Sequence, residues 1–226
     1  MFYFHGSRKP DFTNIIRNNY DDYWEKRGFK LRDKLLEREE IFFKWINPKS
    51  SVIDIGCGNS RLLFELKNKK ACEVCGIDIS HLVIDELNKI GINSKVSNIE
   101  SDDFNIDKQF DYLIISEVLE HLRYPEDLIL KLKKQAKYLL ISIPNSAFYR
   151  YRFGLMFKGR FFTQWREHPS EHLRYWSHRD FLDWLNAMGF ELIRYQSSNG
   201  FLFKDIFVNL FGHQICYLVK SKCSLR

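Results

Sequence analysis

The stretch SVIDIGCGNSRLLFELKNKKACEVCGIDIS, residues 51–80, holds two short apolar runs separated by a turn and a helix-like segment. The first run, Val52–Ile55, ends in Gly-Cys-Gly-Asn-Ser at positions 56–60, and helical character starts near Arg61. The second run is Val74–Ile77. Apolar runs of this kind are typical of parallel strands covered on both faces. The order strand, turn, helix, strand therefore predicts a βαβ unit of the nucleotide-binding type.

The residues at the ends of these two strands indicate the kind of ligand. Gly56 and Gly58 have no Cβ, so the backbone of the turn can approach a ligand closely. The helix that follows presents its N-terminus to negative charge. Asp78 lies 20 residues after Gly58, where an acid can accept hydrogen bonds from a ribose. Arg61 occupies the position of the third glycine of the dinucleotide fingerprint, so the match to that fingerprint is incomplete.

An acid inside the first strand points to a different cofactor. Asp54, two residues before Gly56, completes an acid-x-Gly-x-Gly pattern that resembles the first motif of class I S-adenosylmethionine (SAM)-dependent methyltransferases of the type 11/12 group. The resemblance covers about residues 50–200 and implies a Rossmann-like fold. It also implies that the methionine part of SAM lies against Asp54, Gly56, Gly58 and Ser60, the ribose on Asp78, and the adenine beside Ile79, Asn98 and Ile99, with Ser116 at the end of a later strand completing the site.

The chain beyond residue 80 continues to alternate between helices and strands. Ser80 and Ser177 are good helix N-caps, and Gly91 and Gly189 are good helix terminators. We expect further helices at 80–91, 125–136 and 177–188, and further strands at 95–97, 110–116, 138–143, 190–196 and 214–220. Together with the first two strands, this pattern predicts a seven-stranded, mostly parallel α/β sheet with one antiparallel strand and helices on both faces.

Residues 1–50 precede the sheet, and residues 51–226 form the SAM-binding domain that the resemblance implies, with a substrate-side insertion at about 145–176. Apolar residues recur at helical intervals within residues 21–44, so we expect a helical leader lying over the cofactor cleft. Tyr20, Trp24 and Arg27 share helical spacing, and in related methyltransferases such residues close over the cofactor. An equally supported alternative is that Trp24 fastens the helix to the core.

The composition bounds the class of protein. With 226 residues, 45% of them hydrophobic and 28% charged, the chain is suited to one globular α/β domain, and its net charge of +6 permits an anionic partner. The first ten residues turn polar before an apolar core forms, and no apolar run reaches transmembrane length. Cys72-x-x-Cys75 has no second pair, which favours packed thiols over a metal or redox site. We therefore expect a cytoplasmic protein without a transmembrane segment.

A second group of ionisable residues follows the strand at 110–116. Glu117, Glu120 and His121 are spaced i, i+3 and i+4, so a helical turn would place them on one face at the carboxyl edge of the sheet. Such a face can hold a divalent cation or supply a general base. A simpler interpretation is that Glu117 caps a helix and His121 orients the substrate or the cofactor, and we favour it over a metal.

His172 is a further candidate for this group, because the sequence around it resembles two methyltransferase subgroups. Glu-x-x-Glu-His at 117–121 is followed by Glu171-His172 and by an aromatic-aromatic-Ser-x-Arg-x-Phe segment at 175–181. This resembles the small-RNA 3′-terminal 2′-O-methyltransferases, which bind a metal through such a quartet, and the quinone O-methyltransferases share its first part. The resemblance implies a metal bound by Glu117, Glu120, His121 and His172, and two carboxylates with two imidazoles suit Mg²⁺, Mn²⁺ or Zn²⁺. We expect Glu117, His121 and His172 to take part in catalysis.

Residues 148–166, FYRYRFGLMFKGRFFTQWR, combine five basic residues and eight aromatic residues with no acid. The segment lies where insertions cover the substrate side of the fold, so we expect it to select the acceptor. Cations among aromatics suit single-stranded nucleic acid, and they equally suit peripheral contact with an anionic lipid surface or a phosphorylated sugar. A structural alternative is a helical lid whose aromatic side chains pack on the core.

A third resemblance gives an alternative that is not an enzyme. Ser-Glu-Val-Leu at 116–119, Arg-Tyr-Pro at 123–125 and Ser-Ile-Pro-Asn at 142–145 resemble the methionine-biosynthesis W-type proteins, which have the methyltransferase fold and work with a homoserine acyltransferase. The complete Glu-x-x-Glu-His quintet argues against this alternative. We therefore expect a SAM-dependent O-methyltransferase of a hydroxyl-bearing small or lipid-linked acceptor, with RNA 3′-end 2′-O-methylation or a W-type partner role as alternatives.

Overall fold

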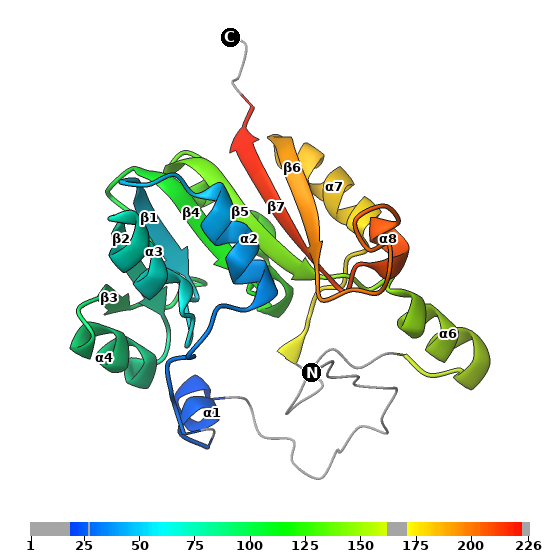
Figure 1. Cartoon of the computed structure of the whole chain (residues 1–226), viewed down its shortest axis with the longest axis horizontal. Helices are drawn as coiled ribbons and strands as arrows, with labels where there is room; N and C mark the ends of the chain where they lie inside the picture. Colours follow the sequence, from blue (N-terminus) through cyan, green and yellow to red (C-terminus); the bar gives the residue numbers. More distant parts are fainter. Residues whose placement is uncertain (1–18, 27, 162–170, 223–226) are drawn as a thin grey trace.

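Seven strands form one sheet in the order β3-β2-β1-β4-β5-β7-β6 in the computed structural model, which describes residues 19–26, 28–161 and 171–222 (Figure 1). β7 is antiparallel to both β5 and β6, and the other neighbouring pairs are parallel. The predicted mostly parallel sheet with one antiparallel strand is confirmed. The strands are β1 Ser51–Ile55, β2 Glu73–Asp78, β3 Asn93–Val96, β4 Phe110–Ser116, β5 Ala136–Pro144, β6 Phe190–Ser198 and β7 Gln214–Ser221.

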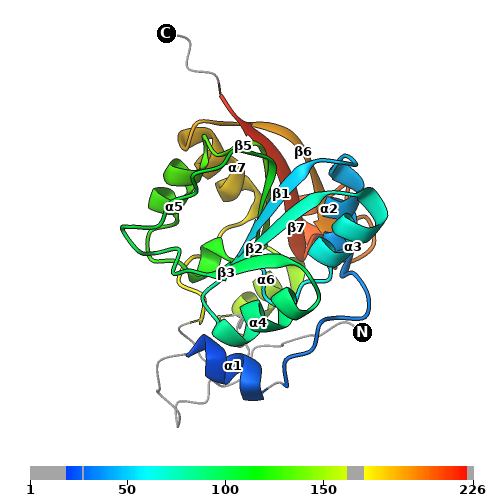
Figure 2. The same ribbon diagram turned by 90° about the vertical axis from the view of Figure 1, so that its left-hand side faces the viewer.

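Helices cover both faces of the sheet, as predicted (Figure 2). On one face lie α2 (Glu37–Trp45), α3 (Leu62–Lys70) and α4 (His81–Lys89), and on the other lie α5 (Pro125–Leu132) and α7 (His178–Ala187). Alternate strand residues point to opposite faces. In β4, Leu113 and Ile115 join the core beneath α5 and α7, whereas Tyr112 and Ile114 join the core beneath α2, α3 and α4. Because the central strands are buried on both sides, their sequences are unbroken apolar runs.

Local signals in the sequence set the ends of α4 and α7. Ser80 Oγ accepts a hydrogen bond from Val83 N at 3.3 Å at the start of α4. Ser177 Oγ accepts from Asp180 N at 3.2 Å, and the Asp180 carboxylate accepts from Ser177 N at 3.1 Å, which forms a capping box at the start of α7. Gly189, just beyond α7, has a φ of +77°, a conformation that favours glycine. The predicted caps of both helices are confirmed.

Several element boundaries differ from those predicted, and two of them show why. The helix expected at 125–136 ends at Leu132, because the carbonyl of Gln135 accepts a hydrogen bond from Phe110 N at the start of β4. The strand expected at 95–97 is instead Asn93–Val96, which pairs with β2. Pairing between distant segments sets both boundaries, and a local sequence pattern does not contain that information.

The described part of the leader, from residue 19 onward, holds two helices separated by an irregular segment. α1 spans Tyr20–Lys26, and Gly28 has a φ of +55°. Leu31 and Leu35 lie in the irregular segment that leads to α2. Residues 1–18 and Arg27 lie outside the described residues.

The substrate-side insertion expected at about 145–176 contains α6, Tyr149–Lys158. Residues 162–170, which include Arg166, lie outside the described residues. A short 3₁₀ turn, η1 (Leu119–His121), follows β4, and α8 (Val208–Phe211) precedes β7. Within the described parts of the chain, no helix has the length and apolar character needed to cross a bilayer.

The order of strands reverses between β1 and β4. The chain runs from β1 outward to β2 and β3, and then places β4 on the other side of β1. Ile55 near the end of β1 is in register with Ile115 near the end of β4. Open parallel sheets bind ligands in the crevice at such a reversal, beyond the carboxyl ends of the strands. The glycine turn after β1 and the ionisable residues after β4 therefore meet at this crevice.

Replacing Ser177 tests how far capping stabilises α7. Ser177→Ala removes the acceptor of the Asp180 N–H, so we expect the free energy of unfolding to fall by about 1 kcal/mol. Ser177→Thr keeps a hydroxyl at the cap and should lose much less. Urea unfolding followed by circular dichroism measures both variants, and an alanine variant as stable as the parent would contradict the role of the cap.

Candidate functional site

A cavity of about 1500 Å³ lies at the carboxyl ends of β1, β2 and β4. Glu117, His121 and His172 line it, and Glu120 is buried beside them at 1% exposure. The structure thus brings the residues selected from the sequence to one place. The cavity wall includes every residue expected to bind the cofactor: Asp54, Gly56, Gly58, Ser60, Asp78, Ile79, Asn98, Ile99 and Ser116.

The turn after β1 brings bare backbone to the cavity wall. Gly56 and Gly58 have φ values of +71° and +50°, in the left-handed region that favours glycine. A Cβ on Gly56 would lie 2.6 Å from Val118 Cγ2, so this position has no room for a side chain. The N–H groups of Gly56 and Cys57 donate to the carbonyl oxygen of Ile77 at 2.7 and 3.1 Å. At these two positions the turn offers close approach to a ligand, and its amides are bonded within the protein.

Two buried carboxylates flank this turn. Asp78 accepts hydrogen bonds from Gly58 N at 2.9 Å and from Ser80 N at 3.0 Å, one on each oxygen, and each oxygen keeps a second lone pair. Asp54 Oδ1 has no hydrogen-bond partner among the described residues. Burial raises the pKa of both acids, and the negative charge of Glu39 raises that of Asp54 further. A cationic ligand would favour the ionised form of both carboxyl groups.

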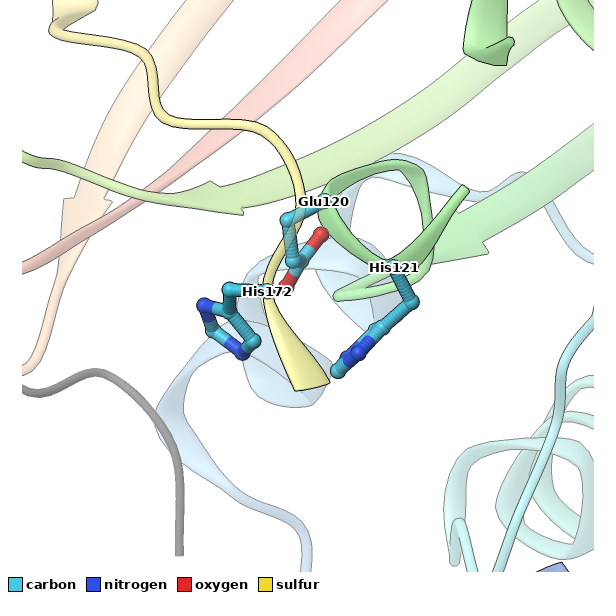
Figure 3. A group of neighbouring side chains, drawn as sticks. All are labelled: Glu120, His121 and His172. Carbon is cyan, nitrogen blue, oxygen red and sulfur yellow. The ribbon is translucent and has the colours of Figure 1, made fainter. Parts of the chain in front are cut away.

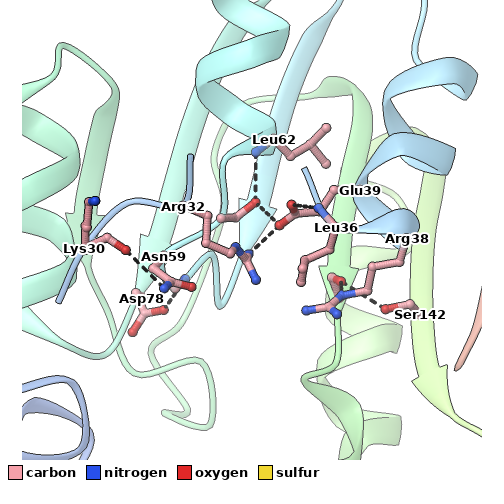
Figure 4. A network of polar contacts seen from close by, with 12 residues as sticks. Lys30, Arg32, Leu36, Arg38, Glu39, Asn59, Leu62, Asp78 and Ser142 are labelled. Atoms are coloured by element: carbon pink, nitrogen blue, oxygen red, sulfur yellow. Dashed lines mark hydrogen bonds and ion pairs between the residues drawn. The ribbon is translucent and has the colours of Figure 1, made fainter. Parts of the chain in front are cut away.

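A polar network joins α2 to the glycine turn (Figure 4). The buried Glu39 carboxylate accepts hydrogen bonds from Arg32 Nη2 at 2.5 Å and from Ser60 Oγ at 2.9 Å. Ser60 Oγ in turn accepts from Leu62 N at 3.1 Å, at the start of α3. Ser60, the last residue of the turn after β1, is therefore held from both sides.

A second chain of hydrogen bonds fixes Glu117. Arg38 Nε donates to Ser116 Oγ at 3.3 Å, the hydroxyls of Ser116 and Ser142 are 3.0 Å apart, and Ser142 Oγ donates to Glu117 Oε1 at 3.0 Å. Gln214 Nε2 donates to the other carboxylate oxygen at 2.5 Å. The φ of Glu117 is +56°, and the residue precedes η1. Glu117 thus bonds to β5 and β7, which differs from the single helical face expected for it.

Arg32, Arg38 and Glu39 also line the cavity, although none of the three belongs to a sequence motif that predicted the site. For Glu39 a signal was present, because it lies four residues after Leu35 and three before Phe42, on the apolar face of α2. A charge on a buried helix face needs a partner, which marks it for attention. Arg32 lies outside the helices and its spacing gives no such signal.

α1 covers the glycine turn from the leader. A Cβ on Gly58 would lie 3.1 Å from Trp24 Cζ2. Asp21 Oδ1 accepts a hydrogen bond from Ser80 Oγ at 2.5 Å, and this bond is the main cause that lowers the pKa of Asp21. Figure 2 shows α1 beside α4. Trp24 packs against the core and also lines the cavity, so both roles considered for it are compatible with its position.

Asn98 is engaged by its own loop. Its Oδ1, the atom that could accept from an adenine amino group, accepts a hydrogen bond from Glu100 N at 3.0 Å. The oxygen keeps a second lone pair for a ligand. Ile79 is exposed at the cavity wall, and Ile99 packs partly against the core.

Glu120, His121 and His172 form a compact group (Figure 3). One ligand atom from each lies within 4.8 Å of the others, and the two imidazole rings meet edge to face with centroids 4.7 Å apart. Backbone contacts bring the two segments together. The carbonyl of Glu120 accepts hydrogen bonds from Leu173 N at 2.7 Å and from Arg174 N at 3.1 Å. Three of the four residues expected to bind a metal are thus adjacent, and Glu117 is bonded elsewhere.

Several polar atoms of this group lack protein partners. Both carboxylate oxygens of Glu120 and Nδ1 of His172 are buried without a hydrogen-bond partner in the described parts of the chain. His121 Nδ1 lies 2.5 Å from the carbonyl oxygen of Glu171. Burial lowers the pKa of His172 to about 3, lowers that of His121, and raises that of Glu120, with the charge of Glu117 raising it further. Neutral imidazoles beside a carboxyl group are suited to binding a cation, which would ionise the carboxyl.

A comparison with protein families decides the class of the chain. Residues 23–195 match a family model described as a methyltransferase domain, and this match covers more than half of the sequence. The chain belongs to this methyltransferase family. The predicted methyltransferase is thereby confirmed at the level of the family.

Solved structures show the same fold for this methyltransferase. A TehB-like SAM-dependent methyltransferase from Corynebacterium glutamicum superposes with a TM-score of 0.61 at 16% identity, covering 90% of this chain and 98% of that one. The methyltransferase domain of bacterial CtHen1-C superposes with a TM-score of 0.58 at 20% identity, covering 83% and 98%. The Rossmann-like methyltransferase fold implied by the sequence is confirmed.

Curated relatives match shorter stretches of this methyltransferase. An eEF1A lysine and N-terminal methyltransferase from Mus musculus is 41% identical over 73 residues, which is 29% of this chain and 10% of the relative. A mitochondrial ubiquinone biosynthesis O-methyltransferase from Dictyostelium discoideum is 34% identical over 119 residues, 45% of this chain and 37% of the relative. A bifunctional MetXA/MetW protein from Rhodopirellula baltica is 26% identical over 132 residues, 54% of this chain and 21% of the relative. The matched stretch is thus well under two thirds of each relative.

Gly58→Ala tests the cofactor turn. The added Cβ would lie 3.1 Å from Trp24 Cζ2 on a backbone whose φ is +50°. The turn must shift to accept it, so we expect the dissociation constant of SAM to rise about tenfold in calorimetry.

Gly159→Ala is the matched control for this variant. Gly159 has a φ of +59° and no atom within 4 Å of the added Cβ. We expect Gly159→Ala to lower the free energy of unfolding by about 1–2 kcal/mol, because alanine is disfavoured at a positive φ. SAM affinity should be unchanged. Equal SAM affinity in both variants and the parent would contradict the role of the turn.

Proposed function

We propose that this methyltransferase transfers a methyl group from SAM to a hydroxyl oxygen of a small or lipid-linked acceptor. One observation carries the proposal: the glycine turn with Asp78 borders the same cavity as His121 and His172, with Glu120 buried beside the two imidazoles. A donor held at the first would face an acceptor held at the second, and alignment of the two is a large part of catalysis. The similarity to a ubiquinone biosynthesis O-methyltransferase supports an oxygen acceptor.

The residues around the turn fit SAM on two grounds. The unpaired buried oxygen of Asp54 suits a positively charged ligand, and the bare turn at Gly56 is a cradle that a Cβ would fill. Arg38, at the cavity wall, suits a carboxylate. In this proposal the methionine part lies against Asp54, Gly56, Gly58 and Ser60, the ribose hydroxyls on Asp78, and the adenine beside Ile79, Asn98 and Ile99, with Ser116 completing the wall.

When bound, SAM supplies an electrophilic methyl group: the S–CH₃ bond breaks with its electrons left on sulfur while the acceptor oxygen forms the new O–CH₃ bond. The protein must then accept the hydroxyl proton. Glu117 lines the cavity with its carboxylate fixed by Ser142 and Gln214, so it is positioned as that base. α1, with Trp24 against the turn, excludes water from the cofactor side.

A divalent cation is the second part of the proposal. Glu120, His121 and His172 fit Mg²⁺, Mn²⁺ or Zn²⁺ because their ligand atoms converge and the Glu120 oxygens have no hydrogen-bond partner among the residues that the structure describes. The carbonyl of Glu171 holds the His121 ring as an outer contact of the kind that orients metal ligands. When bound, the ion would lower the pKa of an acceptor hydroxyl.

Transfer of labelled methyl from SAM tests the acceptor class. We expect label in small or lipid-linked catechols and hydroquinones, and O-methylation is read by mass spectrometry. Label found only in RNA oligonucleotides with free 3′ ends would favour RNA 2′-O-methylation, the second candidate, which is supported by Arg150 and Arg160 at the cavity wall. Absence of transfer, with an acyltransferase co-purifying, would favour the partner role suggested by the MetXA/MetW similarity.

Glu120→Gln and His172→Ala test the cation. Each removes one ligand, so we expect bound metal, measured by elemental analysis, to fall from about one ion per chain to near zero. Methyl transfer should fall about 100-fold or more. His81→Ala, which removes an exposed imidazole on α4, is the control and should retain both. Full methyl transfer by metal-free parent protein would end this part of the proposal.

A further inference from the structure

An exposed apolar surface extends over α6 and the segment between β6 and α8. α6 has no buried residue, and Phe157 and Ile206 are 74% and 71% exposed. A large group of contiguous, exposed apolar side chains marks an interaction site. We define the α6 surface by its exposed residues Phe153, Leu155, Met156, Phe157, Leu202, Phe203, Ile206 and Phe207.

The two halves of the α6 surface lie side by side. The Tyr149 ring at the start of α6 meets the Phe201 ring at 5.4 Å and the Phe211 ring at 5.7 Å. Arg152 Nη2 donates to the carbonyl oxygen of Asn209 at 3.3 Å. Figure 1 shows α6 next to α8 at the same end of the molecule. These contacts leave the outer side chains of both segments exposed.

The outer side chains are held in place by local structure. Phe153, Met156 and Phe157 are spaced i, i+3 and i+4 and share one side of α6, and the rings of Phe153 and Phe157 stack at 5.8 Å. Phe203 has a φ of +63°, a conformation that is strained for a bulky residue. Its side chain is exposed, so no burial within the protein offsets this strain. Strain of this kind clusters at functional surfaces.

The charge beside this surface is mainly positive, and the segment between β6 and α8 adds one exposed acid, Asp205, whose carboxylate accepts a hydrogen bond from Ser197 N. Residues 148–160 contain the cations Arg150, Arg152, Lys158 and Arg160 and no acid. All four side chains are exposed. The neighbouring Lys204 forms an ion pair with Glu37, so its charge is balanced within the protein. Exposed apolar side chains next to an excess of cations are the pattern of helices that lie in the interface of an anionic bilayer.

We propose that the α6 surface docks on an anionic lipid bilayer, with its apolar side chains at the level of the acyl boundary and its cations on the lipid phosphates. Leu155, Met156, Leu202 and Ile206 are aliphatic and do not stack on bases, which favours lipid over single-stranded nucleic acid. A symmetric dimer through this surface would bring like charges together, which disfavours a second copy.

Docking in this way sets the orientation of the cavity. Tyr149, Arg150, Gly154 and Arg160 of the α6 region and Phe201 of the adjoining segment line the cavity wall. The acceptor side of the cavity therefore lies beside the α6 surface and would lie at the bilayer. Docking itself needs neither SAM nor an acceptor, so the proposal goes beyond the methylation reaction and stands or falls separately.

Co-sedimentation of the full chain with vesicles tests the docking. We expect sedimentation with vesicles of phosphatidylcholine and phosphatidylglycerol, and much less with phosphatidylcholine alone. The double variant Phe157→Ser with Ile206→Ser removes two apolar tips, and its partition coefficient should fall about a hundredfold. Lys158→Gln should lower binding about fivefold, and only on the anionic vesicles.

The control is Tyr124→Ser with Leu130→Ser. Tyr124 is 67% exposed and Leu130 is also exposed, but both lie at α5, away from the α6 surface. We expect this double variant to sediment like the parent. SAM affinity and the thermal midpoint of the two double variants, compared with the parent, show that each is folded.

Three results would overturn the proposal. The first is a parent chain that stays in solution with both kinds of vesicle. The second is a Phe157→Ser, Ile206→Ser variant that is folded and sediments as fully as the parent. The third is a parent that is dimeric in sedimentation velocity and becomes monomeric in this variant, because the α6 surface would then be covered by a second copy of the chain.

Discussion

The pairing of β1 with β4 is the constraint on which the site depends. Ile55 is in register with Ile115, so the turn after β1 and the residues after β4 leave the sheet at the same level. The strand order reverses here, and a crevice forms beyond the strand ends. The two segments are in close contact, because a Cβ on Gly56 would lie 2.6 Å from the Val118 side chain. The donor and acceptor halves of the proposed reaction are neighbours because these two strands are neighbours.

Buried carboxylates in this crevice differ in how they are partnered. Glu39 is bonded to Arg32 and Ser60, so its burial is balanced within the protein. Asp54 and Glu120 keep buried oxygens with no protein partner in the described residues. An unpaired buried polar atom costs stability, and such costs are found where a site is prepared for a ligand. This contrast separates Glu39, which is satisfied within the protein, from Asp54 and Glu120, which keep acceptor oxygens for a ligand.

α2 anchors both sides of the cavity. Through Glu39 it holds Ser60 in the glycine motif. Through Glu37, its first residue, it accepts hydrogen bonds from Asn199 N at 2.8 Å and from Lys204 Nζ in the segment that carries half of the α6 surface. A helix from the leader thus fixes the cofactor side and the acceptor side relative to each other, and their spacing does not rest on the sheet alone.

The sequence by itself determined the βαβ unit around Gly56, the seven strands, the caps at Ser80 and Ser177, and the methyltransferase family. These features depend on residues within a few positions of one another, where backbone conformation and alternation of burial are local. The tertiary structure decided which polar groups meet. His172 lies beside Glu120 because the N–H groups of Leu173 and Arg174 donate to the carbonyl oxygen of Glu120. The two segments are more than 50 positions apart in the sequence. Glu117 turns toward Ser142 and Gln214.

The same limit applies to the network around Glu39 and to the surface over α6. Arg32 became a partner of Glu39 through an irregular segment whose path no periodicity records. The sequence showed that residues 148–166 are aromatic and basic, and only the fold showed that Phe153 and Phe157 stay exposed beside Ile206. Contacts between distant segments are set by the packing of the whole chain, which a local pattern does not contain.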